Sequence, residues 1–107
     1  MLKIENELLT ARINPVGAEL SSLIKKNTER EYIWQAEPSV WGRHAPLLFP
    51  AVGRMSGDSF IYDGKKYFMQ KHGFLRGSSF EVVEKTDNSA LLRFSSNEKT
   101  LMSFPFE

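Results

Sequence analysis

The stretch that decides the fold class is Ile61-Tyr62-Asp63-Gly64-Lys65-Lys66-Tyr67-Phe68. Asp63 and Gly64 tolerate the positive φ angles of a tight two-residue turn, and aromatic or β-branched residues flank them on both sides. This pattern predicts a β-hairpin that turns at Asp63-Gly64.

Alternating apolar and polar residues extend the β pattern outward from this hairpin. Residues 2–5, 9–13, 80–83 and 90–95 alternate with a period of two. Such alternation is typical of a strand that turns one face to a core and the other to water. The chain is therefore predicted to be all-β and antiparallel, with no internal repeat.

Turn residues separate the predicted strands, at 14–17 and again at 86–89, where a second hairpin is expected. Residues 18–24 fit either a strand or a helical spacing. No helix-capping pattern follows Gly17, so a strand is favoured.

The segment from Glu37 to Gly57 breaks the pattern. Pro38, Pro46 and Pro50 exclude a regular helix or a central strand there. Apolar loops of this length inside a domain are usually functional or disordered. The aromatic and aliphatic residues of the segment favour a functional loop.

Composition excludes several classes of protein. The 107 residues carry 14 Lys+Arg against 13 Asp+Glu, and 41% are hydrophobic. These values are typical of one soluble globular domain. Binding to nucleic acid or to a membrane surface through bulk charge is excluded, because a net charge of +1 leaves little excess to attract either. The chain lacks cysteine, a signal-peptide pattern and any apolar run near the ~20 residues of a membrane span, so a cytoplasmic location is expected.

Two histidines, His44 and His72, are too few for a zinc site, and we expect no metal. Lys71 and Arg76 flank His72 and are expected to lower the pKa of its imidazole and keep it neutral. A neutral imidazole can hydrogen-bond a sugar hydroxyl. The alternative is that His72 only hydrogen-bonds a nearby backbone carbonyl.

Three arginines lie in glycine-punctuated, aromatic segments: Arg43, Arg54 and Arg76. Guanidinium groups bind hydroxyls, carboxylates or phosphates with two hydrogen bonds, and nearby aromatic rings can stack on a sugar. The alternative is that these arginines form surface ion pairs and the rings fill a core. Glu81 and Glu84 are expected on opposite strand faces, which would exclude them as a carboxylate pair.

Two longer motifs resemble the aldose 1-epimerase (galactose mutarotase) superfamily, most closely its LacX-like and hexose-6-phosphate-epimerase-like branch. They are Pro46-Leu47-Leu48-Phe49-Pro50-Ala51-Val52-Gly53-Arg54 and His72-Gly73-Phe74-Leu75-Arg76. Gly17-Ala18-Glu19-Leu20 and Tyr32-Ile33-Trp34 also resemble the first strands of that family.

The resemblance implies an antiparallel β-sandwich, the galactose mutarotase-like supersandwich, that interconverts the α and β anomers of an aldose without cofactor or metal. The resemblance implies that His72 orients the sugar and that Arg54 and Arg76 bind it. In a phosphorylated substrate, Arg76 would contact the phosphate group. Arg43 occupies the position of a further ligand-binding arginine in that branch of the family. His44 and Ala45 stand where the motif of the branch has two glycines.

Family members are nearly three times as long, and their acid histidine and base glutamate lie later in the chain. Residues 1–107 are therefore expected to be the N-terminal fragment of a single domain that binds sugar, is inactive alone and self-associates. A non-catalytic carbohydrate-binding β-sandwich is the alternative function, and a β protein whose aromatic loop merely packs is a third.

Overall fold

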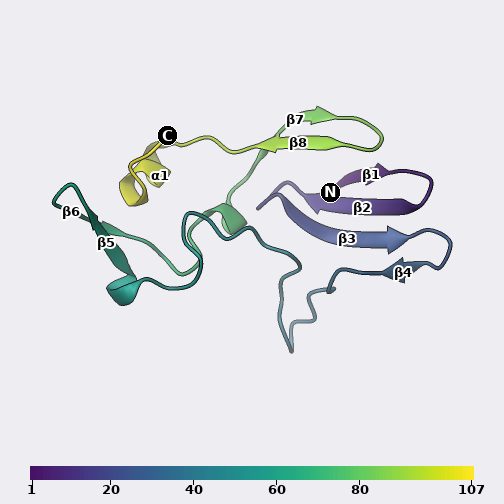
Figure 1. Ribbon diagram of the computed structural model, residues 1–107, viewed down its shortest axis with the longest axis horizontal. Helices are drawn as coiled ribbons and strands as arrows, with labels where there is room; N and C mark the ends of the chain where they lie inside the picture. The colour runs from purple at the N-terminus through teal and green to yellow at the C-terminus, as the bar shows by residue number, and fades with distance from the viewer.

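The computed structural model describes residues 1–107 and contains one four-stranded antiparallel sheet and two separate hairpins (Figure 1). The sheet has the order β1-β2-β3-β4. Its strands are β1 (Leu2–Glu5), β2 (Leu9–Asn14), β3 (Glu19–Lys25) and β4 (Arg30–Glu31). Residues 18–24 thus form mainly a strand, as predicted, and not a helix.

The predicted hairpins are both present. One pairs β5 (Ser59–Tyr62) with β6 (Lys65–Phe68), and the other pairs β7 (Glu81–Lys85) with β8 (Ala90–Arg93). Asp63 and Gly64 have φ angles of 49° and 73°, which confirms the turn expected from their sequence.

Short helical segments lie before, between and after the hairpins. They are η1 (Ser56–Asp58), η2 (Leu75–Gly77) and α1 (Glu98–Ser103). Helix α1 was not predicted from the sequence, although Asn97 and Thr100 form a capping box at its start. No helix of the structure has the length and apolar character needed to cross a membrane.

The expectation for Glu81 and Glu84 was wrong. The register pairs Glu81 with Arg93 and Glu84 with Leu91, so one extra residue of β7 bulges between them. Arg93 and Leu91 are two positions apart on β8 and share a face, which places the two glutamates on that same face. A bulge depends on the partner strand and cannot be read from the parity of one strand.

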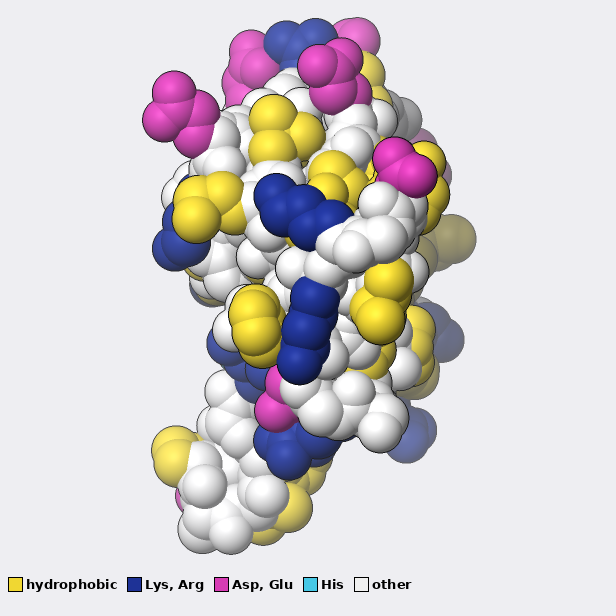
Figure 2. All heavy atoms as spheres, turned by 90° about the vertical axis from the view of Figure 1, so that its left-hand side faces the viewer, with side chains coloured by type: hydrophobic (Ala, Val, Ile, Leu, Met, Phe, Trp, Pro, Cys, Tyr) yellow, Lys and Arg dark blue, Asp and Glu magenta, His cyan; other side chains and the backbone are white.

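The molecule is flat and open. Its Cα radius of gyration is 16.8 Å, against about 13 Å for a compact domain of this length. Only eight residues are buried, and large apolar side chains such as Ile61 and Phe68 are 75% and 66% exposed. Figure 2 shows hydrophobic patches on either side of a line of Lys and Arg side chains on the face near β5 and β6. The sheet and hairpins therefore expose apolar faces that a folded domain normally covers.

We predict that the 107-residue chain self-associates, or folds poorly, when it is alone in solution. Exposed apolar side chains and open strand edges both favour pairing with another chain. Sedimentation velocity over a range of concentrations measures this. Ile61→Lys is expected to reduce the association, whereas Lys66→Ser, directly across the same hairpin, is the matched control. A monodisperse wild-type monomer that unfolds cooperatively would contradict the prediction.

Candidate functional site

The two motif loops meet where Gly73 lies against the backbone of Phe49. The Phe49 carbonyl accepts hydrogen bonds from the N–H groups of Phe74 (3.0 Å) and Leu75 (3.2 Å), and Phe49 and Gly73 form an isolated parallel bridge. Gly73 is buried with a φ of 68°, and a Cβ atom there would collide with the Phe49 carbonyl. Only glycine fits this contact without displacing the backbone.

His72 is held by Gly53 through two hydrogen bonds. The His72 N–H donates to the Gly53 carbonyl, and the Gly53 N–H donates to Nδ1 of the imidazole, each at 2.8 Å. Because Nδ1 accepts, the neutral ring carries its proton on Nε2. The Nδ1 atom of the imidazole therefore accepts from a backbone amide. The alternative interpretation predicts a backbone carbonyl as the partner of the ring.

The environment of His72 disfavours a second proton. Desolvation lowers the pKa of the imidazole below its usual value, and the positive charges of Arg76 and Lys71 lower it further. The predicted direction is thus confirmed, with desolvation as an additional and larger cause. A second proton on the ring would sit on Nδ1, where it would oppose the Gly53 N–H donor and remove that hydrogen bond. His72 is consequently a neutral donor through Nε2 at pH 7.

A cleft of about 890 Å³ brings together residues of both motif loops, β6 and α1. Its charged lining residues are Arg54, Asp58, Lys71, Arg76 and Lys99. Four basic groups against one acidic group make the cleft positive. Asp58 lies 3.3 Å from Nε of Arg54, and Nη2 of Arg76 donates to the Lys71 carbonyl at 3.3 Å. These contacts orient two guanidinium groups that can bind hydroxyls or an anion.

The predicted site residues do not all reach this cleft. Arg54 and Arg76 line it, whereas His72 and Arg43 are outside its lining. His72 is adjacent to Lys71, which lines the cleft, and its ring contacts Gly53, the neighbour of Arg54. Nη1 of Arg43 instead donates to the Arg76 carbonyl at 3.1 Å.

Sequence reasoning missed the contribution of α1 to the cleft. Asn97, Lys99 and Thr100 line it from the start of that helix. The capping pattern of Asn97 and Thr100 is a local signal that could have located the helix, but not the cleft. No group of three or more His, Asp or Glu side chains is placed to hold a metal ion.

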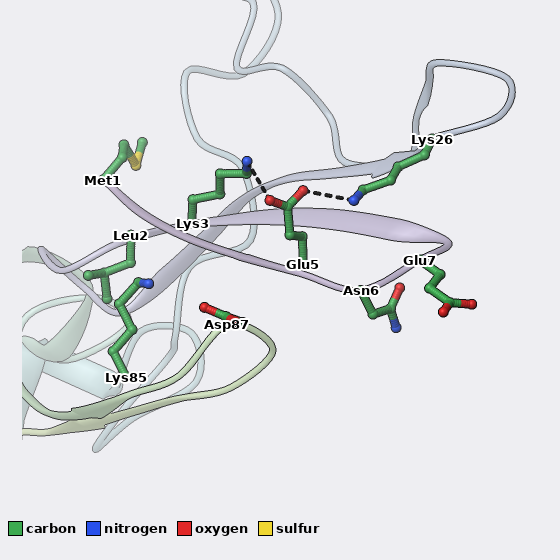
Figure 3. Close-up of a pocket in the computed structure, with 9 residues that line it drawn as sticks. All are labelled: Met1, Leu2, Lys3, Glu5, Asn6, Glu7, Lys26, Lys85 and Asp87. Atoms are coloured by element: carbon green, nitrogen blue, oxygen red, sulfur yellow. Dashed lines mark ion pairs between the residues drawn. The ribbon is translucent and has the colours of Figure 1, made fainter.

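A second hollow, of about 690 Å³, lies between the N-terminal strand and the β7–β8 turn (Figure 3). Glu5 pairs there with Lys3 at 2.7 Å and with Lys26 at 2.8 Å. Hydrogen bonds from Lys26 and Lys3 lower the pKa of the Glu5 carboxyl to about 2. A carboxylate held so strongly in its charged form is a poor general base, so this hollow is the weaker candidate for acid–base chemistry.

We predict that Gly73→Ala separates the two motif loops. Gly64→Ala is the matched control, because Gly64 has a similar positive φ but open space around its Cβ position. The control is expected to destabilise the fold by about 1 kcal/mol through backbone strain alone, and Gly73→Ala by about 3 kcal/mol or more. Amide hydrogen exchange at Phe74 and Leu75 measures the difference. Equal exchange there in the two variants would refute it.

Comparison with known proteins places this geometry in a family. The family model for aldose 1-epimerase matches residues 1–107. The LacX protein of Lactococcus lactis subsp. lactis, in its chromosomal form, is 32% identical over 99% of this chain and 37% of its own length. The chain thus spans little more than a third of the curated relatives that it matches.

Solved structures of related proteins contain the same fold as this chain. A galactose mutarotase-like protein from Lactobacillus casei is similar to the chain with a TM-score of 0.96 and 40% identity, over 99% of this chain and 36% of the other. A galactose mutarotase related enzyme from Lactobacillus acidophilus is similar with a TM-score of 0.95 and 43% identity, over 98% and 35%. The family match runs through both motif loops and through the strands that carry them. The chain therefore belongs to the aldose 1-epimerase family and has the antiparallel β architecture of part of a galactose mutarotase-like sandwich.

Proposed function

We propose that residues 1–107 form the N-terminal, sugar-binding part of a single galactose mutarotase-like domain that interconverts the α and β anomers of an aldose. The observation that supports this most directly is the shared cleft of Arg54 and Arg76, one from each motif loop. The Phe49–Gly73 contact keeps these loops together. We propose an aldohexose, neutral or phosphorylated, as the substrate.

Anomer interconversion requires a general base and a general acid in hydrogen-bond reach of the sugar. The base removes the proton of the C1 hydroxyl while the acid protonates the ring oxygen, and the bond between C1 and the ring oxygen breaks. C1 then turns about its bond to C2, and ring closure with the reverse proton transfers gives the other anomer. The reaction needs no redox step, and we propose that it uses no cofactor.

Within this scheme we propose that His72, which is outside the cleft lining but adjacent to the lining residue Lys71, donates from Nε2 to a sugar that extends from the cleft toward it. We propose that the acid–base pair comes from outside the 107 residues. The lining of the cleft supports this division. Asp58 is its one carboxylate, and it is already engaged in an ion pair with Arg54. The absence of cysteine accords with a cytoplasmic setting, which we include in the proposal.

A non-catalytic carbohydrate-binding β-sandwich is the second candidate function. The ion pair between Asp58 and Arg54 is also consistent with this binding-only function, because a binding protein needs the arginines but no general base. The two candidate functions predict different results for turnover by a longer relative. Both predict that the arginines bind sugar.

We predict that the chain alone does not accelerate mutarotation. Polarimetry of freshly dissolved α-glucose and α-galactose measures the rate against the spontaneous reaction, and the Lactobacillus acidophilus enzyme serves as the longer comparison protein. Acceleration by the 107 residues would contradict the placement of the base outside them. No acceleration by the longer protein with any aldose, neutral or phosphorylated, would favour the binding-only function.

We predict that Arg54→Ala and Arg76→Ala each weaken binding of glucose 6-phosphate about tenfold, since each removes a charged hydrogen-bond donor from the cleft. Isothermal titration calorimetry measures the dissociation constants. Arg93→Ala is the control, because Arg93 pairs with Glu81 on the β7–β8 hairpin and does not line the cleft. Unchanged affinity in both cleft variants would favour a β protein whose aromatic loop merely packs.

A further inference from the structure

We propose that Glu19 is a positioning residue for the cleft. Its buried carboxylate acts with Arg43 to hold the backbone at Arg76, and through that backbone it sets where the Arg76 guanidinium lies. The effect on sugar binding rests on the function proposed above, whereas the placement of Arg76 does not.

Glu19 is a buried carboxylate with defined partners. It is 6% exposed at the start of β3, and its Oε1 accepts hydrogen bonds from the N–H groups of His44 (2.8 Å) and Ala45 (3.0 Å). Burial of a charge is costly unless hydrogen bonds and an opposite charge compensate it. These two bonds therefore fasten the loop that carries Arg43 to the central sheet.

Arg43 carries this constraint onward to the cleft. Its Nη1 lies 3.9 Å from Oε2 of Glu19 and donates to the Arg76 carbonyl at 3.1 Å. The first contact is an ion pair without a close hydrogen bond, and the second is a direct bond to the backbone of a residue that lines the cleft. Glu19 thus reaches Arg76 through a single side chain.

The turn before Glu19 holds the same backbone by a second path. The Gly17 N–H donates to the Ser78 carbonyl at 2.7 Å, and a Cβ atom on Gly17 would lie only 2.7 Å from the Arg76 carbonyl oxygen. The turn and the Arg43 side chain therefore both contact the segment from Arg76 to Ser78. This gives the Gly17-Ala18-Glu19 motif a role that packing of β3 alone does not explain.

Glu31 provides a matched comparison within the chain. It also binds two backbone amides, those of Leu23 and Ile33, each at 2.8 Å. It accepts from the hydroxyl of Ser22 as well, and none of these partners lines the cleft. Loss of the charge on Glu31 is expected to disturb only the sheet around it. Loss of the charge on Glu19 is expected to change the position of the Arg76 backbone as well.

The test compares Glu19→Gln with Glu31→Gln in the full 107-residue chain by hydrogen exchange with mass spectrometry, which tolerates self-association. The Gly77 and Ser78 amides donate to the Phe74 and Leu75 carbonyls and report on the Arg76 backbone. We expect exchange of these amides to rise about tenfold in Glu19→Gln and to stay unchanged in Glu31→Gln. Arg43→Gln leaves the two amide bonds to Glu19 in place and is expected to match Glu19→Gln, which covers the case in which the latter does not fold.

Binding of glucose 6-phosphate separates positioning from general destabilisation. Glu19→Gln is expected to weaken binding about tenfold in the wild-type chain but to have no further effect once Arg76 is replaced by Ala. A persisting effect in the Arg76→Ala background, unchanged exchange at Gly77 and Ser78 in both Glu19→Gln and Arg43→Gln, or equal exchange changes in Glu31→Gln, would each overturn the proposal. If the wild-type chain binds no sugar phosphate, the proposed function is in question, and the exchange comparison still decides the role of Glu19.

Discussion

The contact between Gly73 and the Phe49 carbonyl is the constraint on which the site depends. It joins two loops that are distant in the sequence, and those loops carry the cleft arginines. Of the eight buried residues, two lie at this junction, Ala51 and Gly73, and two lie in the turn before β3 and at the start of β3, Gly17 and Glu19. Burial in this chain is thus concentrated where backbone and polar groups meet, and little of it lies between apolar sheet faces. The position of the site follows from hydrogen bonds and close backbone approach more than from a hydrophobic core.

The same basic residues have two effects on the electrostatics of the site. Lys71 and Arg76 make the cleft positive, and they also help to lower the pKa of His72. A hydrogen bond from the Gly53 N–H to Nδ1 favours the neutral ring in the same direction. The region therefore attracts anions and hydroxyls through permanently charged groups and keeps its imidazole as a neutral donor. Its positive charge comes from Lys and Arg side chains and does not depend on a protonated histidine.

Local signals predicted the strands and hairpins, and the features that were missed, apart from the locally capped helix α1, depend on partner segments. Asp63-Gly64 determines its hairpin through the φ angles of two residues, so that element could be predicted from the sequence alone. The bulge that brings Glu81 and Glu84 to one face depends on pairing with β8, and the contacts of Arg43 depend on a carboxylate and a carbonyl from distant segments. A family resemblance identifies Arg43 as a residue of interest. Only the fold shows that it contacts the Arg76 backbone.

The open sheets and the well-connected site loops have different consequences for folding and for function. The junction at Phe49, Gly73 and Glu19 uses contacts made within the 107 residues, so its hydrogen bonds do not require partners from a strand layer that would cover the apolar sheet faces. Binding residues would then be in place while the faces remain available to a further layer of strands, as a sandwich requires. The proposed catalytic pair would enter with that layer and meet a sugar already held by arginines. Under the proposed function, turnover but not recognition would then depend on completion of the sandwich.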